Sequence, residues 1–267
     1  MYSWINQGLD YTRPAKRELM PIGTLLGYAK EHWLPYACHM LCISVMAKII
    51  GPYYAYVLAV VFTAFVLILF AVQGKYPELT ARGTTTKDWL LAALVGVVGI
   101  VVWIAPYHFF PKLMLARIPI LGNENIYLSF TYGAQLLDDG TVKATYQPFK
   151  DLAPNLQIPF IIFRMLGAVV TVPFFEELFT RSFIIRFVED EQYKRVPIGW
   201  YTKQSFIIAL VFFVVAHPWW LVAVAWGLLI MWLLYYKKNL LLCVFAHAVS
   251  NLLLAWYVLE YKAFYLW

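Results

Sequence analysis

Long apolar runs separated by short polar connections occupy the chain from about residue 33 to residue 260. A helix crosses a bilayer when roughly 20 mainly apolar residues follow one another, and about 17 can suffice. The pattern predicts seven spans, and Pro173 in the fourth predicts a kink or a break. An interfacial helix around Pro21–Lys30 would raise the count to eight. The predicted spans are residues 33–50, 53–73, 89–110, 157–188, 204–217, 219–236 and 240–260.

The composition agrees with this pattern, because 62% of the residues are hydrophobic, 13% are charged and the mean hydropathy is +0.66. Soluble domains are usually about half apolar and a quarter charged. We therefore predict an all-α, polytopic membrane helix bundle of about seven to eight transmembrane helices, with residues 1–267 forming a single membrane domain. The lipid bilayer is the expected partner. The net charge of +6 does not indicate nucleic-acid binding, because the basic residues lie in the connections between apolar runs.

Basic residues also set the expected orientation. Lysines and arginines gather in alternate connections, and the connections at Gly51-Pro52 and Pro218 contain none. The positive-inside rule then places the N-terminus in the cytoplasm. The 111–156 loop contains both acidic and basic residues. Because a loop of this length can be translocated across the membrane regardless of its charge, we expect it to be extracytoplasmic. Within it, Asp138-Asp139-Gly140 predicts a turn.

Small residues on the third predicted span indicate close helix packing. Ala92 and Gly96 are four residues apart, and Gly99 follows one turn later. Small residues at this spacing let two helix backbones approach each other in a membrane. This prediction concerns structure and requires no function.

Ionisable residues inside a membrane are costly and therefore point to function. Lys48, His108 and Arg164 lie near span ends, where long or polar side chains can reach the interface, and we interpret His39 as structural. The remaining polar residues fall into the motifs Glu176-Glu177-x-x-x-Arg181, Phe213-x-x-x-His217 and His247-x-x-x-Asn251.

The spacing within these motifs predicts which groups pair. Glu177 and Arg181 are one helical turn apart and can neutralise each other. Glu176 is rotated from Glu177 by about 100° and has no partner on its own helix. Counted at about 1.5 Å per residue from the charged residues at the cytoplasmic ends of their helices, the three motifs reach a similar depth. We therefore expect Glu176 to find its partners on the two later helices.

This set of side chains suits the hydrolysis of an amide. A carboxylate in a dry site is a competent base near neutral pH, so Glu176 and His217 are expected to activate water. His247 and Asn251 can stabilise the oxyanion of a tetrahedral intermediate. Glu177, Arg181 and Phe213 are the expected supporting residues. The motifs offer no serine or cysteine nucleophile, which favours direct attack by water.

Three alternatives stay open at this point. No cofactor is expected, but zinc bound by Glu176, His217 and His247 is an alternative, although the chain lacks a His-Glu-x-x-His helix. The same polar cavity can belong to a non-enzymatic membrane protein that binds a peptide or lipid, as in immunity. A proton-coupled transporter is the third alternative, and the absence of inverted repeats counts against it.

The order and spacing of the three motifs resemble the CPBP family of CAAX proteases and bacteriocin-processing enzymes, also called Abi. The resemblance covers about residues 157–260, which would be the catalytic core helices. The segments VPFFEELFTRSFIIRF and FAHAVSNLLLAWYVLEYKAFYLW are most similar to the bacterial, exosortase-associated branch of CAAX prenyl protease-related proteins. Ser182 is one departure, since many relatives have glycine after the arginine.

The resemblance implies a multi-helix intramembrane endopeptidase of the glutamate type. It assigns water activation to Glu176 and His217 and the oxyanion site to His247 and Asn251. The implied substrate is a membrane-associated peptide or protein, with or without an attached lipid. The implied location is a bacterial inner or plasma membrane.

Overall fold

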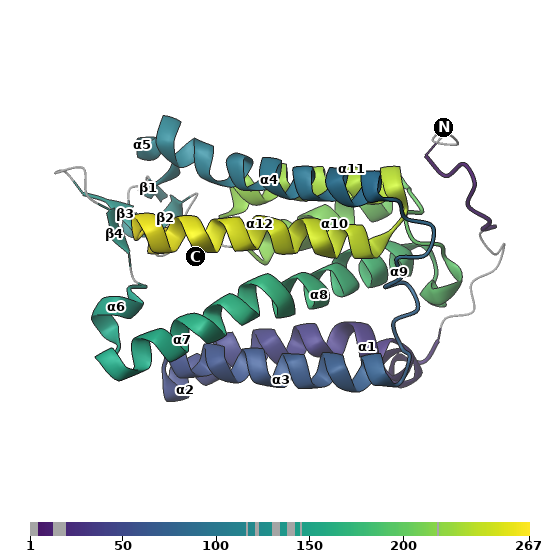
Figure 1. Cartoon of the computed structure of the whole chain (residues 1–267), viewed down its shortest axis with the longest axis horizontal. Helices are drawn as coiled ribbons and strands as arrows, with labels where there is room; N and C mark the ends of the chain where they lie inside the picture. Colours follow the sequence, from purple (N-terminus) through teal and green to yellow (C-terminus); the bar gives the residue numbers. More distant parts are fainter. Residues whose placement is uncertain are drawn as a thin grey trace.

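The computed structural model shows a bundle of helices whose axes run close to one common direction (Figure 1). Long apolar helices confirm the all-α, polytopic fold predicted for the membrane part. The structure describes residues 5–12, 20–115, 117–120, 123–129, 134–137, 142–144, 146–217 and 219–267.

The helices of the first half are α1 (Ile22–Leu41), the π-helical segment η1 (Cys42–Met46), α2 (Ala47–Ile50), α3 (Pro52–Val72), α4 (Thr86–Phe109) and α5 (Pro111–Met114). Those of the second half are α6 (Pro148–Asp151), α7 (Pro154–Leu166), the π-helical η2 (Gly167–Thr171), α8 (Val172–Glu177), the π-helical η3 (Leu178–Ile184), α9 (Ile185–Glu189), the 3-10 helix η4 (Tyr193–Arg195), α10 (Lys203–Val215), α11 (Trp220–Lys237), α12 (Leu240–Tyr261) and the 3-10 helix η5 (Phe264–Leu266).

Among the described residues, six helical stretches are long and apolar enough to cross a membrane, so the predicted count of seven to eight is too high. The predicted span 204–217 corresponds to α10, which has only 13 residues. At about 1.5 Å per residue it is about 20 Å long, compared with about 30 Å for the hydrocarbon core. The end of α10 at Val215 fits the sequence, because Pro218 follows closely. A proline disfavours helical geometry at the residue before it, which here is His217.

The predicted interfacial helix around Pro21–Lys30 is also wrong as a separate element. The chain from Ile22 to Ile50 is one continuous helical stretch that includes α1, η1 and α2. The polar sequence Lys30-Glu31-His32 continues the helix instead of ending it. Two of these polar residues, Glu31 and His32, are buried.

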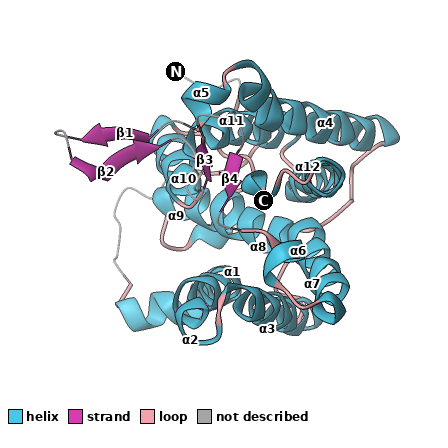
Figure 2. Ribbon diagram, turned by 90° about the vertical axis from the view of Figure 1, so that its left-hand side faces the viewer, coloured by secondary structure: helices cyan, strands magenta, loops and turns pink. Residues whose placement is uncertain are grey.

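Viewed from one end, the helices form two groups with the α7–α9 segment between them (Figure 2). In one group α1 packs against α3, and in the other α4 packs against α11 and α12. The α7–α9 segment contacts both groups, through α3 on one side and α12 on the other. Pro173 does not break this segment, which is helical throughout and contains η2 and η3 on either side of the proline.

The glycines of α4 confirm the predicted close packing. A Cβ atom added to Gly96 would lie 2.6 Å from the carbonyl oxygen of Ala246 on α12. One added to Gly99 would lie 2.9 Å from Nε1 of Trp226 on α11. α4 can therefore approach both neighbours only because these two positions lack side chains.

Two short β-hairpins lie within the loop predicted for residues 111–156. Strand β1 (Arg117–Ile120) pairs antiparallel with β2 (Asn123–Ser129), and β3 (Ala134–Leu136) pairs antiparallel with β4 (Val142–Ala144). The pattern of apolar and polar residues did not predict these strands. The turn predicted at residues 138–140 lies outside the described residues.

The two ends of the bundle differ in their connections (Figure 1). The hairpins and the C-terminus lie at one end, and the N-terminal segment lies at the other. The connections from α3 to α4, from α9 to α10 and from α11 to α12 all lie at the N-terminal end. The basic connections thus share one end of the bundle, as the alternation of charge predicted.

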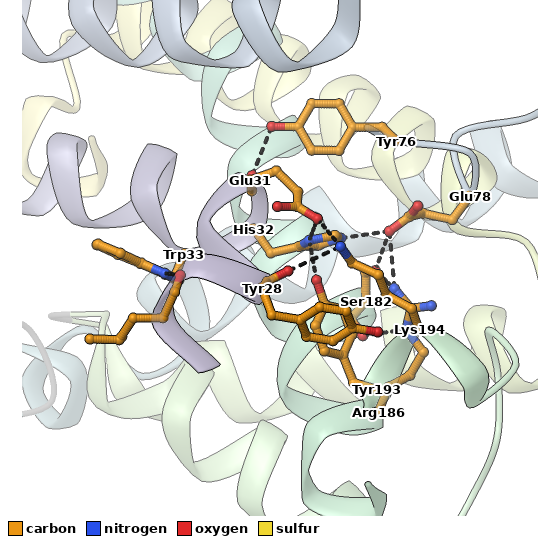
Figure 3. A network of polar contacts seen from close by, with 11 residues as sticks. Tyr28, Glu31, His32, Trp33, Tyr76, Glu78, Ser182, Arg186, Tyr193 and Lys194 are labelled. Atoms are coloured by element: carbon orange, nitrogen blue, oxygen red, sulfur yellow. Dashed lines mark hydrogen bonds and ion pairs between the residues drawn. The ribbon is translucent and has the colours of Figure 1, made fainter. Parts of the chain in front are cut away.

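A buried polar network fixes the α9 end of the α7–α9 segment (Figure 3). Its centre is Glu78, in the connection between α3 and α4. Oε1 of Glu78 accepts hydrogen bonds from Nε2 of His32 at 2.6 Å and from Oγ of Ser182 at 2.6 Å. Nη2 of Arg186 donates to the same oxygen at 3.0 Å. One carboxylate therefore joins α1, the α3–α4 connection and the η3–α9 region.

A second carboxylate extends this network (Figure 3). The side chain of Glu31 forms an ion pair with Lys194, and its backbone oxygen accepts a hydrogen bond from the Tyr76 hydroxyl at 2.8 Å. The Tyr193 hydroxyl bonds Nδ1 of His32 at 2.8 Å. These contacts bind η4, which follows α9, to α1.

We expect the substitution Gly96→Ala to destabilise the bundle, because the new methyl group would overlap backbone atoms of α12. Overpacking of this kind costs about 1–3 kcal/mol, so the thermal unfolding midpoint in detergent should fall. The matched control is Gly27→Ala on α1, where an added Cβ meets nothing within 4 Å. An unchanged midpoint for Gly96→Ala would contradict the close approach of α4 and α12.

The Glu78 network predicts a pH-dependent stability. Burial by itself raises the pKa of Glu78, but the His32 hydrogen bond and the charges of His32 and Arg186 lower it from 4.5 to about 2. Since the folded-state pKa is depressed, this stabilisation is fully present above pH 4.5 and is lost as the pH falls toward 2.

Glu78→Gln should therefore lower the unfolding midpoint at neutral pH by several degrees, and its difference from the wild type should narrow as the pH falls below 4.5. Thermal unfolding followed by tryptophan fluorescence between neutral and acid pH measures this. Glu260→Gln, at an exposed position on α12, is the control for loss of a carboxylate. A difference that stays constant over the whole range would show that Glu78 does not act through its charge.

Candidate active site

A cavity of about 390 Å³ lies inside the bundle, with α8, the end of α10 and α12 contributing to its wall together with α1, α3, α4, α7 and α11. The four predicted catalytic residues, Glu176, His217, His247 and Asn251, all line it. The predicted supporting residue Phe213 is also part of the lining. The structure therefore brings the three sequence motifs together around one space.

Glu176 faces His217 across the cavity. Oε2 of Glu176 lies 3.8 Å from Nε2 of His217, and this oxygen has no hydrogen-bond partner among the described residues. Nδ1 of His217 is 2.7 Å from the carbonyl oxygen of Phe213. Because a carbonyl only accepts, Nδ1 must carry the hydrogen, and a neutral ring then has its lone pair on Nε2. Two acceptors thus point into the same small space.

Glu177, unlike its neighbour Glu176, forms a buried ion pair. Its Oε1 lies 3.2 Å from Nη1 of Arg181, and both side chains are completely buried. The ion pair predicted from the i, i+4 spacing is therefore formed. The same oxygen accepts a hydrogen bond from Nδ1 of His247 at 2.9 Å. Glu177 consequently joins α8 to α12 and fixes the orientation of the His247 ring.

The contact with Glu177 determines what His247 can do. Nδ1 donates to a carboxylate, so Nε2 of His247 carries a hydrogen only when the ring is doubly protonated. A doubly protonated His247 would present one N–H to the cavity and have its other N–H held by Glu177.

Asn251 is positioned by an irregularity of the backbone. In η2 the hydrogen bonds run from residue i+5 to residue i, and the Val172 N–H donates to Gly167. The next bond of this series would need an N–H on Pro173, which has none. Nδ2 of Asn251 supplies the missing donor to the Ala168 carbonyl oxygen at 2.7 Å. The second N–H of the Asn251 amide remains available to the cavity.

Aromatic rings enclose these polar groups. The Phe213 ring has the Arg181 guanidinium 4.3 Å from its centroid and the His217 ring at 4.2 Å. Trp226 packs edge-on against His247 at 4.5 Å, and its Nε1 lies 3.2 Å from Oγ of Ser250. Trp226 was not predicted as part of the site. Since 18% of the chain is aromatic, residue type alone could not distinguish it.

Two residues for which the sequence predicted no functional role also line the cavity. Arg164 was interpreted as an interfacial side chain and His39 as structural, but both contribute to the lining. Lys48 and His108, in contrast, are exposed near helix ends, as the sequence predicted. His39 and Arg164 differ from Lys48 and His108 because α1 and α7 pack around the cavity. The sequence of a single helix does not reveal this packing.

The residues also allow a test of whether a metal ion fits. No group of three or more His, Cys, Asp or Glu side chains in the described parts of the chain is arranged to hold a metal ion. Nδ1 of His247 is already bound to Glu177, which leaves its Nε2 as the ring atom facing the cavity. The zinc ligand set considered from the sequence is therefore not preformed.

Comparison with known families supports this picture. Residues 158–253 match the family described as type II CAAX prenyl endopeptidase Rce1-like. The matched segment contains all three motifs and confirms the resemblance found from them. No curated protein and no solved structure matches the chain.

Proposed function

Because residues 158–253 match the Rce1-like family of type II CAAX prenyl endopeptidases, we propose that this multi-pass membrane protein is an intramembrane endopeptidase. It would hydrolyse a peptide bond of a membrane-associated protein or peptide. The observation that carries the proposal is the pair formed by Glu176 and His217, whose facing acceptor atoms are 3.8 Å apart in the cavity.

The first chemical step follows from this pair. A carboxylate oxygen and a ring nitrogen that both accept can each bind one hydrogen of the same water molecule. The water oxygen then has its lone pair free to attack the carbonyl carbon of the substrate. Glu176 takes the proton of the attacking water and is the general base. The same carboxyl group can return that proton to the leaving amine when the carbon–nitrogen bond breaks.

The oxyanion of the tetrahedral intermediate would be stabilised from α12. The free N–H of Asn251 and the Nε2–H of doubly protonated His247 are the two donors. Loss of one such donor typically costs about 10²–10³-fold in rate. Glu177 supports this step by balancing the His247 charge, and Arg181 balances Glu177 in turn.

The proposed orientation and location follow from the charge distribution and the family resemblance. The basic connections share the N-terminal end of the bundle, so this end would face the cytoplasm. The 111–156 segment would then lie outside. A bacterial inner or plasma membrane is the proposed location, and a prenylated CAAX-type peptide is the first substrate to test because the matching family carries that description.

The substitution Glu176→Gln should abolish proteolysis while leaving the fold intact, because it removes the base and keeps the shape of the side chain. General bases typically contribute about 10²–10⁴-fold to the rate. The measurement is cleavage of a prenylated CAAX-type peptide by purified protein, together with a comparison of membrane-protein termini in cells carrying either form. Glu260→Gln is the control for an exposed carboxylate and should retain activity.

Cleavage by Glu176→Gln at the wild-type rate would contradict this mechanism. Metal analysis of the purified protein and a chelator test distinguish the proposed metal-free mechanism from a zinc-dependent one. A stoichiometric zinc ion on which activity depends would contradict the metal-free mechanism. A wild-type protein that binds peptide or lipid but cleaves none of the termini compared would support the non-enzymatic binding role instead.

A further inference from the structure

Arg164 is a cation in the cavity wall without a counter-ion. It lies on α7 and lines the same cavity as Glu176. No ion pair joins it to any acidic residue in the described parts of the chain. Asp151, the last residue of α6, accepts hydrogen bonds from the Tyr53 hydroxyl and from the Gln147 N–H.

Three aromatic rings surround the Arg164 guanidinium. Its carbon lies 4.3 Å from the ring centroid of Tyr56, 5.0 Å from that of Trp267 and 5.9 Å from that of Tyr146. Such contacts stabilise a desolvated cation through the negative face of the aromatic ring. They act through the ring faces and do not satisfy the Nε–H of the guanidinium, which has no hydrogen-bond partner among the described residues.

Several hydrogen-bond donors remain unused around this cation. The buried atoms Nε of Arg164, Oη of Tyr146 and Nε1 of Trp267 have no hydrogen-bond partner among the described residues. Both aromatic residues line the cavity with Arg164. Buried donors without partners are rare because each costs free energy, so a cluster of them next to a cation indicates a binding site for an anion.

A carboxylate is the anion that fits this arrangement best. The cluster contains a single positive charge, and the planar guanidinium can bind the two oxygens of a carboxylate at once. The site shares its cavity with Glu176, so its ligand is expected to be part of the substrate. A phospholipid phosphate would bind the same donors but has no reason to share a cavity with the proposed catalytic base.

We propose that Arg164, with Tyr146 and Trp267, binds the free C-terminal carboxylate of the substrate peptide, an inference that rests on the proposed endopeptidase function. Arg164 and Glu176 are on one helical stretch, twelve residues and therefore about 18 Å apart along its axis. An extended peptide covers about 3.3–3.6 Å per residue. Cleavage is then directed to a bond about five residues before the C-terminus.

The test compares two forms of one prenylated CAAX-type peptide, one with a free C-terminal carboxylate and one with a C-terminal amide. The wild type should cleave the acid about 10- to 100-fold more efficiently in kcat/KM, mainly through a lower KM. Arg164→Gln should cleave both forms at the rate of the amide. Arg164→Lys, which keeps the charge but loses the planar fork, should retain part of the preference.

If Arg164→Gln does not fold, variants with smaller changes still test the carboxylate site. Tyr146→Phe and Trp267→Phe each remove one donor and keep the ring, and each should reduce the preference for the acid several-fold. Lys150→Gln removes an exposed positive charge on α6 and is the control for general electrostatic attraction. It should leave the ratio of acid to amide cleavage unchanged.

The outcomes separate this inference from the proposed function. Equal kcat/KM for acid and amide in the wild type would overturn the carboxylate site and leave the endopeptidase function intact. If the wild type cleaves neither peptide, binding of the two forms to Glu176→Gln protein decides the inference, and equal binding overturns it. Loss of co-purifying phospholipid in Arg164→Gln, without any preference for the acid, would assign the site to a lipid and also overturn it.

Discussion

The buried ion pair between Glu177 and Arg181 is the interaction on which the rest of the site depends. An isolated charge inside a membrane is costly, and here each member of the pair neutralises the other within one helical turn. Glu177 also holds His247, so the pair connects α8 to α12 as well as balancing charge. Glu176 is left without such a partner, and it is the carboxylate that reaches the cavity. Two adjacent glutamates thus have opposite roles because they project from the helix in different directions.

Irregular backbone provides the second connection between the same helices. The π-helical turn before Pro173 leaves the Ala168 carbonyl without its donor, and Asn251 supplies one from α12. Within a bilayer such a carbonyl must be satisfied by protein or by enclosed polar groups. The requirement that positions Asn251 is therefore a structural one, and it also places the remaining N–H of the amide where it can serve chemistry. At the other end of the segment, Ser182 takes part in the Glu78 network, so the residue that departs from the family pattern has a structural role here.

Much of this arrangement could be predicted from the sequence because it depends on local spacing. The i, i+4 pair, the meeting of the three motifs and the close packing at Gly96 all follow from helix geometry and depth. The β-hairpins and the Glu78 network could not be predicted, because they depend on contacts between segments far apart in the chain. Arg164 was misjudged for the same reason. Its distance from the span end was correct, but only the packing of α1 and α7 shows that its side chain faces a cavity.

The shortness of α10 has a consequence for the surrounding lipid. With 13 residues it is about 10 Å too short for the hydrocarbon core, which is a hydrophobic mismatch. The bilayer beside it must thin, or polar segments of the protein must fill the difference. In the first case the lipid barrier is thinnest next to Val215, two residues before His217. A hydrolytic reaction needs water at that level of the membrane, and this local thinning shortens the path by which solvent reaches the cavity.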